Sequence, residues 1–272
     1  MKNLLLGEGS SAPVERELTA SASSASNLAE PPSGFARQTS PGWVSSIRQW
    51  GLVLLFHLLL AGAQAAPKLA VTATVGMVAD LASSVGGERV QVESLMGPGV
   101  DPHLYKATAS DVNKLQRAHV IFYVGLLLEG KMQDLFNRMA RTKRHVYAVT
   151  EGVPEDLLLE PPEFEGHYDP HVWFDVPLWS RCVEVVVKGL SEADPAGREA
   201  YVARGEETRR RLAGLHDWVS KRVDEIPAGR RVLVTSHDAF NYFGRAYGFK
   251  VVALQGISTV NEASAADLVK LV

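Results

Sequence analysis

The chain has 272 residues, of which 46% are hydrophobic and 22% are charged, and it carries a formal net charge of −3 at pH 7. These values are typical of a soluble globular protein with one large or two smaller domains, and no clustered basic stripe indicates nucleic-acid binding. The single cysteine, Cys182, excludes a disulfide framework and any zinc site built from cysteines. A transition-metal site in this chain would therefore need histidine and carboxylate ligands.

The first 65 residues differ in composition from the rest of the chain. Residues 1–47 are rich in Ser and Ala without helical or strand periodicity, and this predicts a disordered leader. Residues 48–65 combine a basic residue, an apolar run from Trp50 to Ala61 and small residues ending at Ala65, the order of a cleaved secretory signal peptide. A transmembrane anchor is the alternative, but the run is shorter than the ~20 apolar residues that a spanning helix needs. Because no Cys follows the run for lipid attachment, we expect an exported, periplasmic protein.

From Lys68 onward the pattern alternates between strands and helices. Strands are expected at residues 69–77, 89–96, 119–125 and 145–149, and helices at 78–87, 108–118 and 128–140. Thr108 or Ser110 is the expected N-cap of the second of these helices. Such alternation predicts a mainly parallel sheet covered by helices, so residues 66–190 are interpreted as an N-terminal α/β metal-binding lobe.

A long, highly charged helical segment follows. Asp194 and Pro195 form a plausible N-cap and first helical residue, and the segment runs to Ile226 with a thin apolar stripe. Residues 191–227 are therefore interpreted as a helix that links two lobes. A second α/β pattern occupies residues 228–272, with strands at 230–236 and 249–255 and helices at 237–248 and 263–272. Two strands and two helices make a poor core, so we expect this second lobe to be incomplete and the chain to be truncated at its C-terminus.

Three histidines are the candidate functional residues. The pattern Asp-Pro-His-apolar-aromatic begins at Asp101 and again at Asp169 and presents His103 and His171, while His237 follows the strand 230–236. Asp-Pro opens many ordinary turns, so the repeat by itself could be coincidence. Ligands of open parallel sheets, however, bind near the carboxyl ends of strands, and imidazole is a common ligand of Zn, Mn, Fe, Ni and Cu. We therefore expect the three rings to meet between the lobes, with the two Asp carboxylates accepting hydrogen bonds from ligand rings.

The other histidines are assigned to structural or surface positions. Two of them open expected strands, one lies in the signal segment and one lies on the long helix: His119, His145, His57 and His216. His167 lies four residues before the second candidate ligand. A solvent-exposed or structural role is favoured for it over that of an auxiliary metal ligand.

Three segments carry a family resemblance, in this order: "GPGVDPHLYKATASDVNKLQRAHVIFYVGLLLEGKM", "HYDPHVWFDVPLWS" and "RRVLVTSHDAFNYFGRAYGFKVVALQGISTVNEASAADL". Together they resemble the substrate-binding proteins of zinc/manganese ABC importers, the TroA/ZnuA-like cluster A-I family, from about Leu69 to the end. The resemblance implies two α/β lobes joined by one long rigid helix, with a metal between them. It also implies the ligands His103, His171 and His237. The short segment before the second ligand and the His at the third position fit the TroA-like branch.

The fourth ligand of the family is a carboxylate late in the second lobe, and that region lies beyond Val272. Glu262 is not in the ligand segment, so it is not a candidate. The resemblance implies a periplasmic receptor, not an enzyme, that captures Zn²⁺ or Mn²⁺ and delivers it to ABC permease and ATPase subunits. We expect a monomer. Three nitrogen ligands favour Zn²⁺ over Mn²⁺ on intrinsic affinity, and binding should weaken below about pH 6.5 as imidazole protonates.

Two alternatives remain open. The first is an exported hydrolase with a three-His zinc and an activated water. No HExxH or GxSxG motif and no general base beside the histidines supports it. The second is a metal-binding surface adhesin without a transport function.

Overall fold

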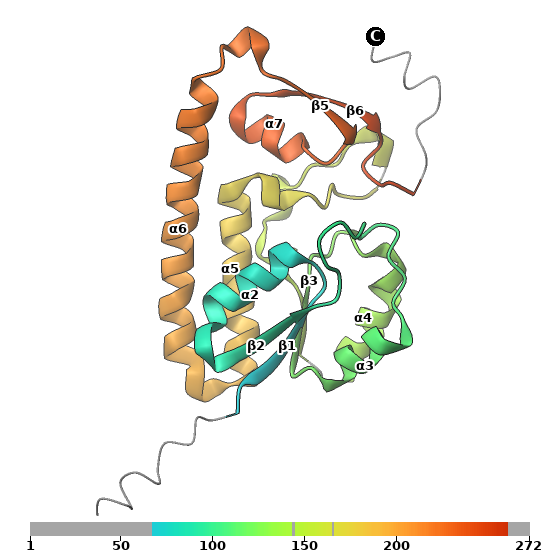
Figure 1. Ribbon diagram of the computed structural model, residues 1–272, viewed down its shortest axis with the longest axis vertical. Helices are drawn as coiled ribbons and strands as arrows, with labels where there is room; N and C mark the ends of the chain where they lie inside the picture. Colours follow the sequence, from blue (N-terminus) through green and yellow to red (C-terminus); the bar gives the residue numbers. More distant parts are fainter. Residues whose placement is uncertain (1–66, 143–144, 165, 261–272) are drawn as a thin grey trace, which may run out of the picture. The chain divides into compact units, whose positions relative to one another are not determined.

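The computed structural model describes residues 67–142, 145–164 and 166–260 (Figure 1). The expected leader at 1–47, the signal peptide at 48–65 with His57, the expected helix at 263–272 and Glu262 all lie outside these ranges. Within them, no helix is both long enough and apolar enough to cross a membrane.

A four-stranded parallel sheet forms the centre of the first half of the structure. Its strands run in the order β2-β1-β3-β4, with the bounds β1 Leu69–Ala73, β2 Val90–Ser94, β3 Val120–Tyr123 and β4 His145–Ala148. All four residues of β3 are buried, as expected of a central strand in a sheet covered on both faces. The predicted strands and their parallel arrangement are therefore confirmed. β1 ends earlier than predicted because a helix already begins at Gly76.

Helices cover both faces of this sheet. α2 (Gly76–Gly86) lies on one face, and α3 (Ala109–Arg117) and α4 (Gln133–Arg141) lie on the other (Figure 1). Thr108 caps α3 as predicted, because its hydroxyl accepts the N–H of Asp111 while the Asp111 carboxylate accepts the N–H of Thr108. The three helices bury their apolar sides against the strands, and their connections bring the strand ends to one edge of the sheet.

Two long helices follow. α5 (Val176–Ala193) has 18 residues and buries Cys182, Val186 and Leu190 at four-residue spacing, although the sequence pattern did not predict it. α6 (Arg198–Asp224) has 27 residues and packs along α5 and α2. Gly205 permits the close approach of α5, since a Cβ there would lie 2.6 Å from a methyl carbon of Val187.

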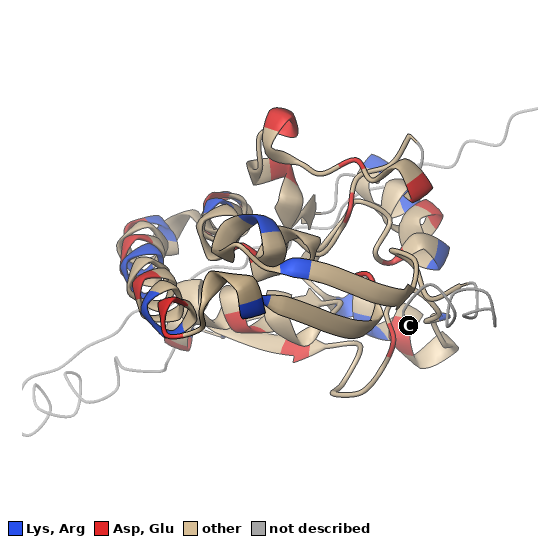
Figure 2. Ribbon diagram, turned by 90° about the horizontal axis from the view of Figure 1, so that it is seen from above, with Lys and Arg blue, Asp and Glu red and all other residues tan. Residues whose placement is uncertain are grey.

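The long helix expected within residues 191–227 is present but starts later than expected, and its role as a link between two lobes stays a prediction. Residues 191–193 belong to α5, and a short turn at Pro195–Gly197 separates the two helices. The Asp194 carboxylate accepts hydrogen bonds from the Arg89 guanidinium and the Tyr201 hydroxyl, which fixes this turn against the start of α6. Figure 2 shows acidic and basic residues along α6, consistent with its polar sequence.

The second α/β segment contains β5 (Val232–His237), α7 (Asn241–Tyr247) and β6 (Lys250–Gln255). The two strands pair in parallel as a two-stranded sheet, as the sequence predicts. α7 begins four residues later than predicted because His237 is the last residue of β5. The side chains of Val232 and Val234 are 52% and 56% exposed, so one face of this small sheet has little cover among the described residues.

Candidate metal centre

His103 lies in the loop that follows β2. The backbone N–H of His103 donates a 2.9 Å hydrogen bond to Oδ1 of Asp101, and the intervening Pro102 fixes one backbone dihedral of the turn. The imidazole is only 6% exposed. The Asp-Pro-His sequence therefore builds a tight turn that directs this ring into the protein.

His171 repeats this arrangement in the loop before α5. Its backbone N–H donates to Oδ1 of Asp169 at 2.9 Å, and its ring Nδ1 lies 2.7 Å from the same oxygen. Both residues are buried, with exposed fractions of 2% and 0%. Because a carboxylate accepts and does not donate, Nδ1 carries the proton and Nε2 remains available as a metal ligand.

His237 comes from the second sheet. It is the last residue of β5 and is half-buried. Its ring centre lies 5.9 Å from that of His103 and 5.4 Å from that of His171. The carboxyl end of a parallel strand thus delivers the third imidazole, as the sequence argument expected.

The three imidazoles form one cluster. Each offers a ring nitrogen, and these nitrogens lie within 4.8 Å of one another. The Nε2 atoms of His103 and His171 are 3.2 Å apart. A tetrahedral zinc ion with Zn–N bonds of about 2.0–2.1 Å needs donor atoms about 3.3 Å apart, so this pair has the required spacing. Three nitrogen donors in this arrangement fit a divalent transition metal, and among the described residues no carboxylate joins them.

The cluster opens onto a cavity of about 470 Å³. Its lining is mostly apolar and aromatic, with a few polar groups: Met77, Gly99, Val100, Asp101, Pro102, His103, Leu128, His171, Trp173, Phe174, Ser236, His237, Ala239, Phe240, Gln255 and Thr259. The edge of the Trp173 indole and the His171 ring approach at right angles, with ring centres 5.2 Å apart. Such walls place apolar surface beside the imidazoles and leave a space larger than a bare ion.

Burial controls the protonation of the site. Loss of hydration, followed by the nearby His171, lowers the pKa of His103 to about 4. The same two causes lower the pKa of His237. Proton competition at His103 therefore begins well below the pH of about 6.5 expected for an ordinary imidazole. Near neutral pH both rings are neutral and ready to bind a cation.

The sequence also predicted roles for two aspartates and one further histidine near the cluster. Asp169 accepts a hydrogen bond from a candidate ligand ring, as expected, whereas Asp101 accepts the backbone N–H of His103 and not its ring. His167 is exposed and its ring lies 5.3 Å from that of Phe164, in agreement with the solvent-exposed position expected for it, while its role stays a prediction.

Three further histidines contact partners outside the cluster. Nδ1 of His119 accepts the N–H of Ala70, and Nδ1 of His145 lies 3.2 Å from the Tyr147 hydroxyl. Nδ1 of His216 lies 3.2 Å from the Tyr247 hydroxyl. These contacts give each ring a structural role, as the sequence indicated.

Sequence reasoning missed two residues beside the site. Thr259, after β6, donates to Asp101, and Asn241, at the start of α7, donates to Asp169. Each lies within four residues of the carboxyl end of a strand of the second sheet, which is the one local signal that could have indicated them.

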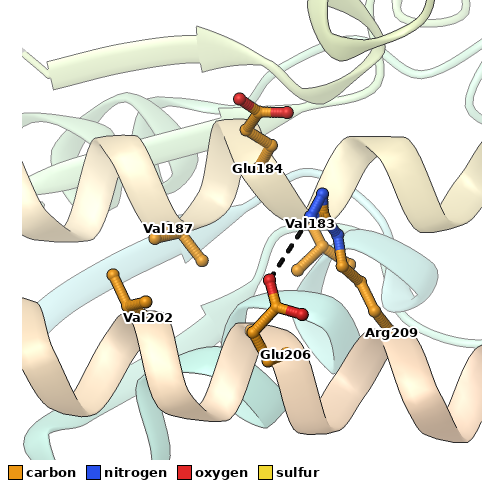
Figure 3. Close-up of a pocket in the computed structure, with 7 residues that line it drawn as sticks. Val183, Glu184, Val187, Val202, Glu206 and Arg209 are labelled. Carbon is orange, nitrogen blue, oxygen red and sulfur yellow. Dashed lines mark ion pairs between the residues drawn. The ribbon is translucent and has the colours of Figure 1, made fainter.

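A second cavity, of about 210 Å³, lies between α5 and α6 (Figure 3). Valines from both helices line it, and Glu206 and Arg209 form a 3.5 Å ion pair at its edge. Because its described charges are largely paired and it holds no cluster of metal ligands, we assign no function to it.

Comparison with known proteins gives consistent results. Residues 71–272 match the family model described as zinc-uptake complex component A, periplasmic (ZnuA). The chain is 46% identical over 213 residues to the manganese-binding lipoprotein MntA of Bacillus subtilis, covering 78% of this chain and 69% of MntA. It is 47% identical over 203 residues to the zinc-binding protein TroA of Treponema pallidum, covering 74% of this chain and 64% of TroA. The solved structure of periplasmic TroA from Treponema pallidum matches with a TM-score of 0.72 and 46% identity, over 75% of this chain and 73% of that chain.

Proposed function

The chain belongs to the ZnuA family of periplasmic metal-uptake components, and on this premise we propose that it captures Zn²⁺ or Mn²⁺ as the substrate-binding component of an ABC importer. The single observation that carries the proposal is the cluster of His103, His171 and His237, whose ring nitrogens lie within 4.8 Å of one another. The family consists of binding proteins and not of enzymes, so the hydrolase alternative is set aside. No described feature favours an adhesin.

The three histidines are the proposed ligands, and the metal is the cargo. Capture needs no proton release from His103 near neutral pH, because burial already keeps that imidazole neutral. Asp169 holds the His171 ring in one tautomer and one orientation, which lowers the entropy cost of binding. A carboxylate from outside the described residues, or a water, would complete the coordination. Three nitrogen donors favour Zn²⁺ over Mn²⁺ on intrinsic affinity.

We further propose a two-lobe arrangement, with residues 66–190 and 228–272 as lobes and residues 191–227 as the link. The presence of α6 between the two parallel sheets in chain order supports it. Permease and ATPase subunits are the proposed partners, and the mature protein is proposed to act in the periplasm as a monomer. The family description and the predicted signal peptide support this location.

A calorimetric titration tests the proposed function. The metal-free full chain is titrated with Zn²⁺ and then with Mn²⁺ at pH 7, beside His171→Ala and the control His119→Ala, which lies outside the cluster. One-to-one binding by the parent and the control, lost in His171→Ala, is the expected result. Equal binding by all three proteins would mean that the metal binds elsewhere.

A further inference from the structure

The two Asp-Pro-His turns share more than a sequence. In each turn, Oδ1 of the Asp accepts the backbone N–H of the His two residues later, and both hydrogen bonds are 2.9 Å long. This bond closes the turn and sets the direction of the imidazole. In both turns the carboxylate therefore has a second oxygen, Oδ2, that does not take part in closing the turn.

The second oxygen of each carboxylate binds a side chain from the same distant segment. Oδ2 of Asp101 accepts a 2.6 Å hydrogen bond from the Thr259 hydroxyl, across 158 residues of sequence. Oδ2 of Asp169 accepts a 3.3 Å hydrogen bond from the Asn241 amide, across 72 residues. Asn241 begins α7 and Thr259 follows β6, so both belong to residues 232–260, the segment that also supplies His237. We call these two hydrogen bonds the carboxylate latches.

Further contacts surround the carboxylate latches. Asp169 is fully buried, and its backbone carbonyl also accepts the Tyr242 hydroxyl from α7 at 2.9 Å. At 2.6 Å the Thr259–Asp101 bond has the length typical of a hydroxyl that donates to an ionised carboxylate, a class of bond about twice as strong as neutral ones, whereas the Asn241–Asp169 bond at 3.3 Å is longer.

Each latch therefore connects the loop that carries one candidate ligand to the segment that carries the third ligand. If a latch breaks, its turn loses the contact that fixes it relative to His237, and the nitrogen spacing is no longer held. We propose that Thr259 and Asn241 are positioning residues for metal capture, which slow metal release by holding the turns of His103 and His171 against His237. The inference rests on the proposed function and extends it to two residues that touch no metal.

The first test measures zinc release. The full chain is loaded with one equivalent of Zn²⁺ and mixed with excess chelator, and the dissociation rate is followed by stopped flow. Thr259→Val and Asn241→Leu should each release zinc about tenfold faster, the usual lower range for loss of a partner that orients a metal ligand. Thr259→Ser, which keeps the hydroxyl, should restore the parent rate.

A matched control distinguishes positioning of the two histidine turns from a general effect of holding α7 in place. Arg245 on α7 donates to the carbonyl of Leu157 and to Asp175, but it contacts neither turn carboxylate. Arg245→Met should therefore leave the zinc release rate within about twofold of the parent. Parent-like release from both latch variants, or equal acceleration by Arg245→Met, would overturn the proposal.

The second test needs no metal. Amide hydrogen exchange of the metal-free chain is measured at the backbone N–H groups of His103 and His171. Thr259→Val should speed exchange at His103 alone, and Asn241→Leu should speed exchange at His171 alone. Exchange that is unchanged, or equally changed at both amides in each variant, would overturn the latches. Failure of the parent to bind zinc while this crossed pattern is present would overturn the proposed function and leave the latches supported.

Discussion

Acid should destabilise the metal-free protein through His103 in particular. Its pKa is about 4 in the folded chain, whereas an unfolded histidine has a pKa of 6.5. Below pH 6.5 the unfolded state therefore binds a proton that the folded state does not, so the stability present above that pH is lost as the pH falls towards 4. The side chain is only 6% exposed, which means that little of this effect is screened by solvent.

The loss of unfolding free energy can be worked out from the lowered pKa of His103. Each pH unit between the two pKa values costs up to about 1.4 kcal/mol, so a change from pH 7 to pH 5 should remove about 2 kcal/mol of unfolding free energy through His103. His237, whose pKa is also lowered by burial and by His171, adds to the loss in the same direction. A loss of this size is a large part of the total stability of a typical domain.

Urea unfolding of the chelator-treated chain at pH 7, 6 and 5 provides the assay. His103→Asn cannot titrate, so it should lose about 2 kcal/mol less than the parent over this interval, whatever its stability at pH 7. His119→Asn is the control, because that ring lies outside the cluster and accepts the N–H of Ala70. Parallel pH profiles for the parent and His103→Asn would refute the reasoning.

Further substitutions and metal removal give additional predictions. Gly189→Ala should destabilise the chain by about 1–3 kcal/mol in urea unfolding, because its Cβ would lie 2.8 Å from the rings of Phe122 and Tyr147; a neutral result would mean that both rings can shift. Gly214→Ala, in the interior of α6 with nothing within 4 Å, should stabilise by up to about 1 kcal/mol. Thr108→Ala should cost about 1 kcal/mol through the lost cap of α3, and Thr108→Ser should not. Zn²⁺ at a hundred times its dissociation constant should add about 2.7 kcal/mol of stability, and a chelator should remove it; no shift in the thermal midpoint would contradict the metal site.

The sequence predicts most of the elements but misses one of the longest. Alternating strands and helices with recognisable caps identify the parallel sheets, because those signals are local. α5 escapes detection since Val183, Val185, Val186 and Val187 form a β-branched run, which is typical of a buried strand. Packing against the sheet and α6 overrides that preference, and such packing has no local signature.

The residues of the candidate site, like the elements of the fold, could be predicted from the sequence only in part. The repeated Asp-Pro-His motif and the histidine at a strand end indicate the ligand types, and the structure brings these three side chains together. Thr259 and Asn241 could not be predicted as their partners, because hydrogen bonds across 158 and 72 residues depend on how the two sheets pack. Long-range contacts of this kind follow from the completed fold.

The spacing of the three histidines along the chain has a consequence for unfolding. His103 and His171 are 68 residues apart, and His171 and His237 are 237 − 171 = 66 apart. A metal bound to all three would close two long loops in a chain that has one buried cysteine and no disulfide among its described residues. Because ligands this far apart in sequence meet only in the folded chain, the metal binds the folded state in preference to the unfolded state and stabilises it by linkage. Release of the ion to the importer would therefore also leave a metal-free protein that unfolds more easily and is more sensitive to proteases.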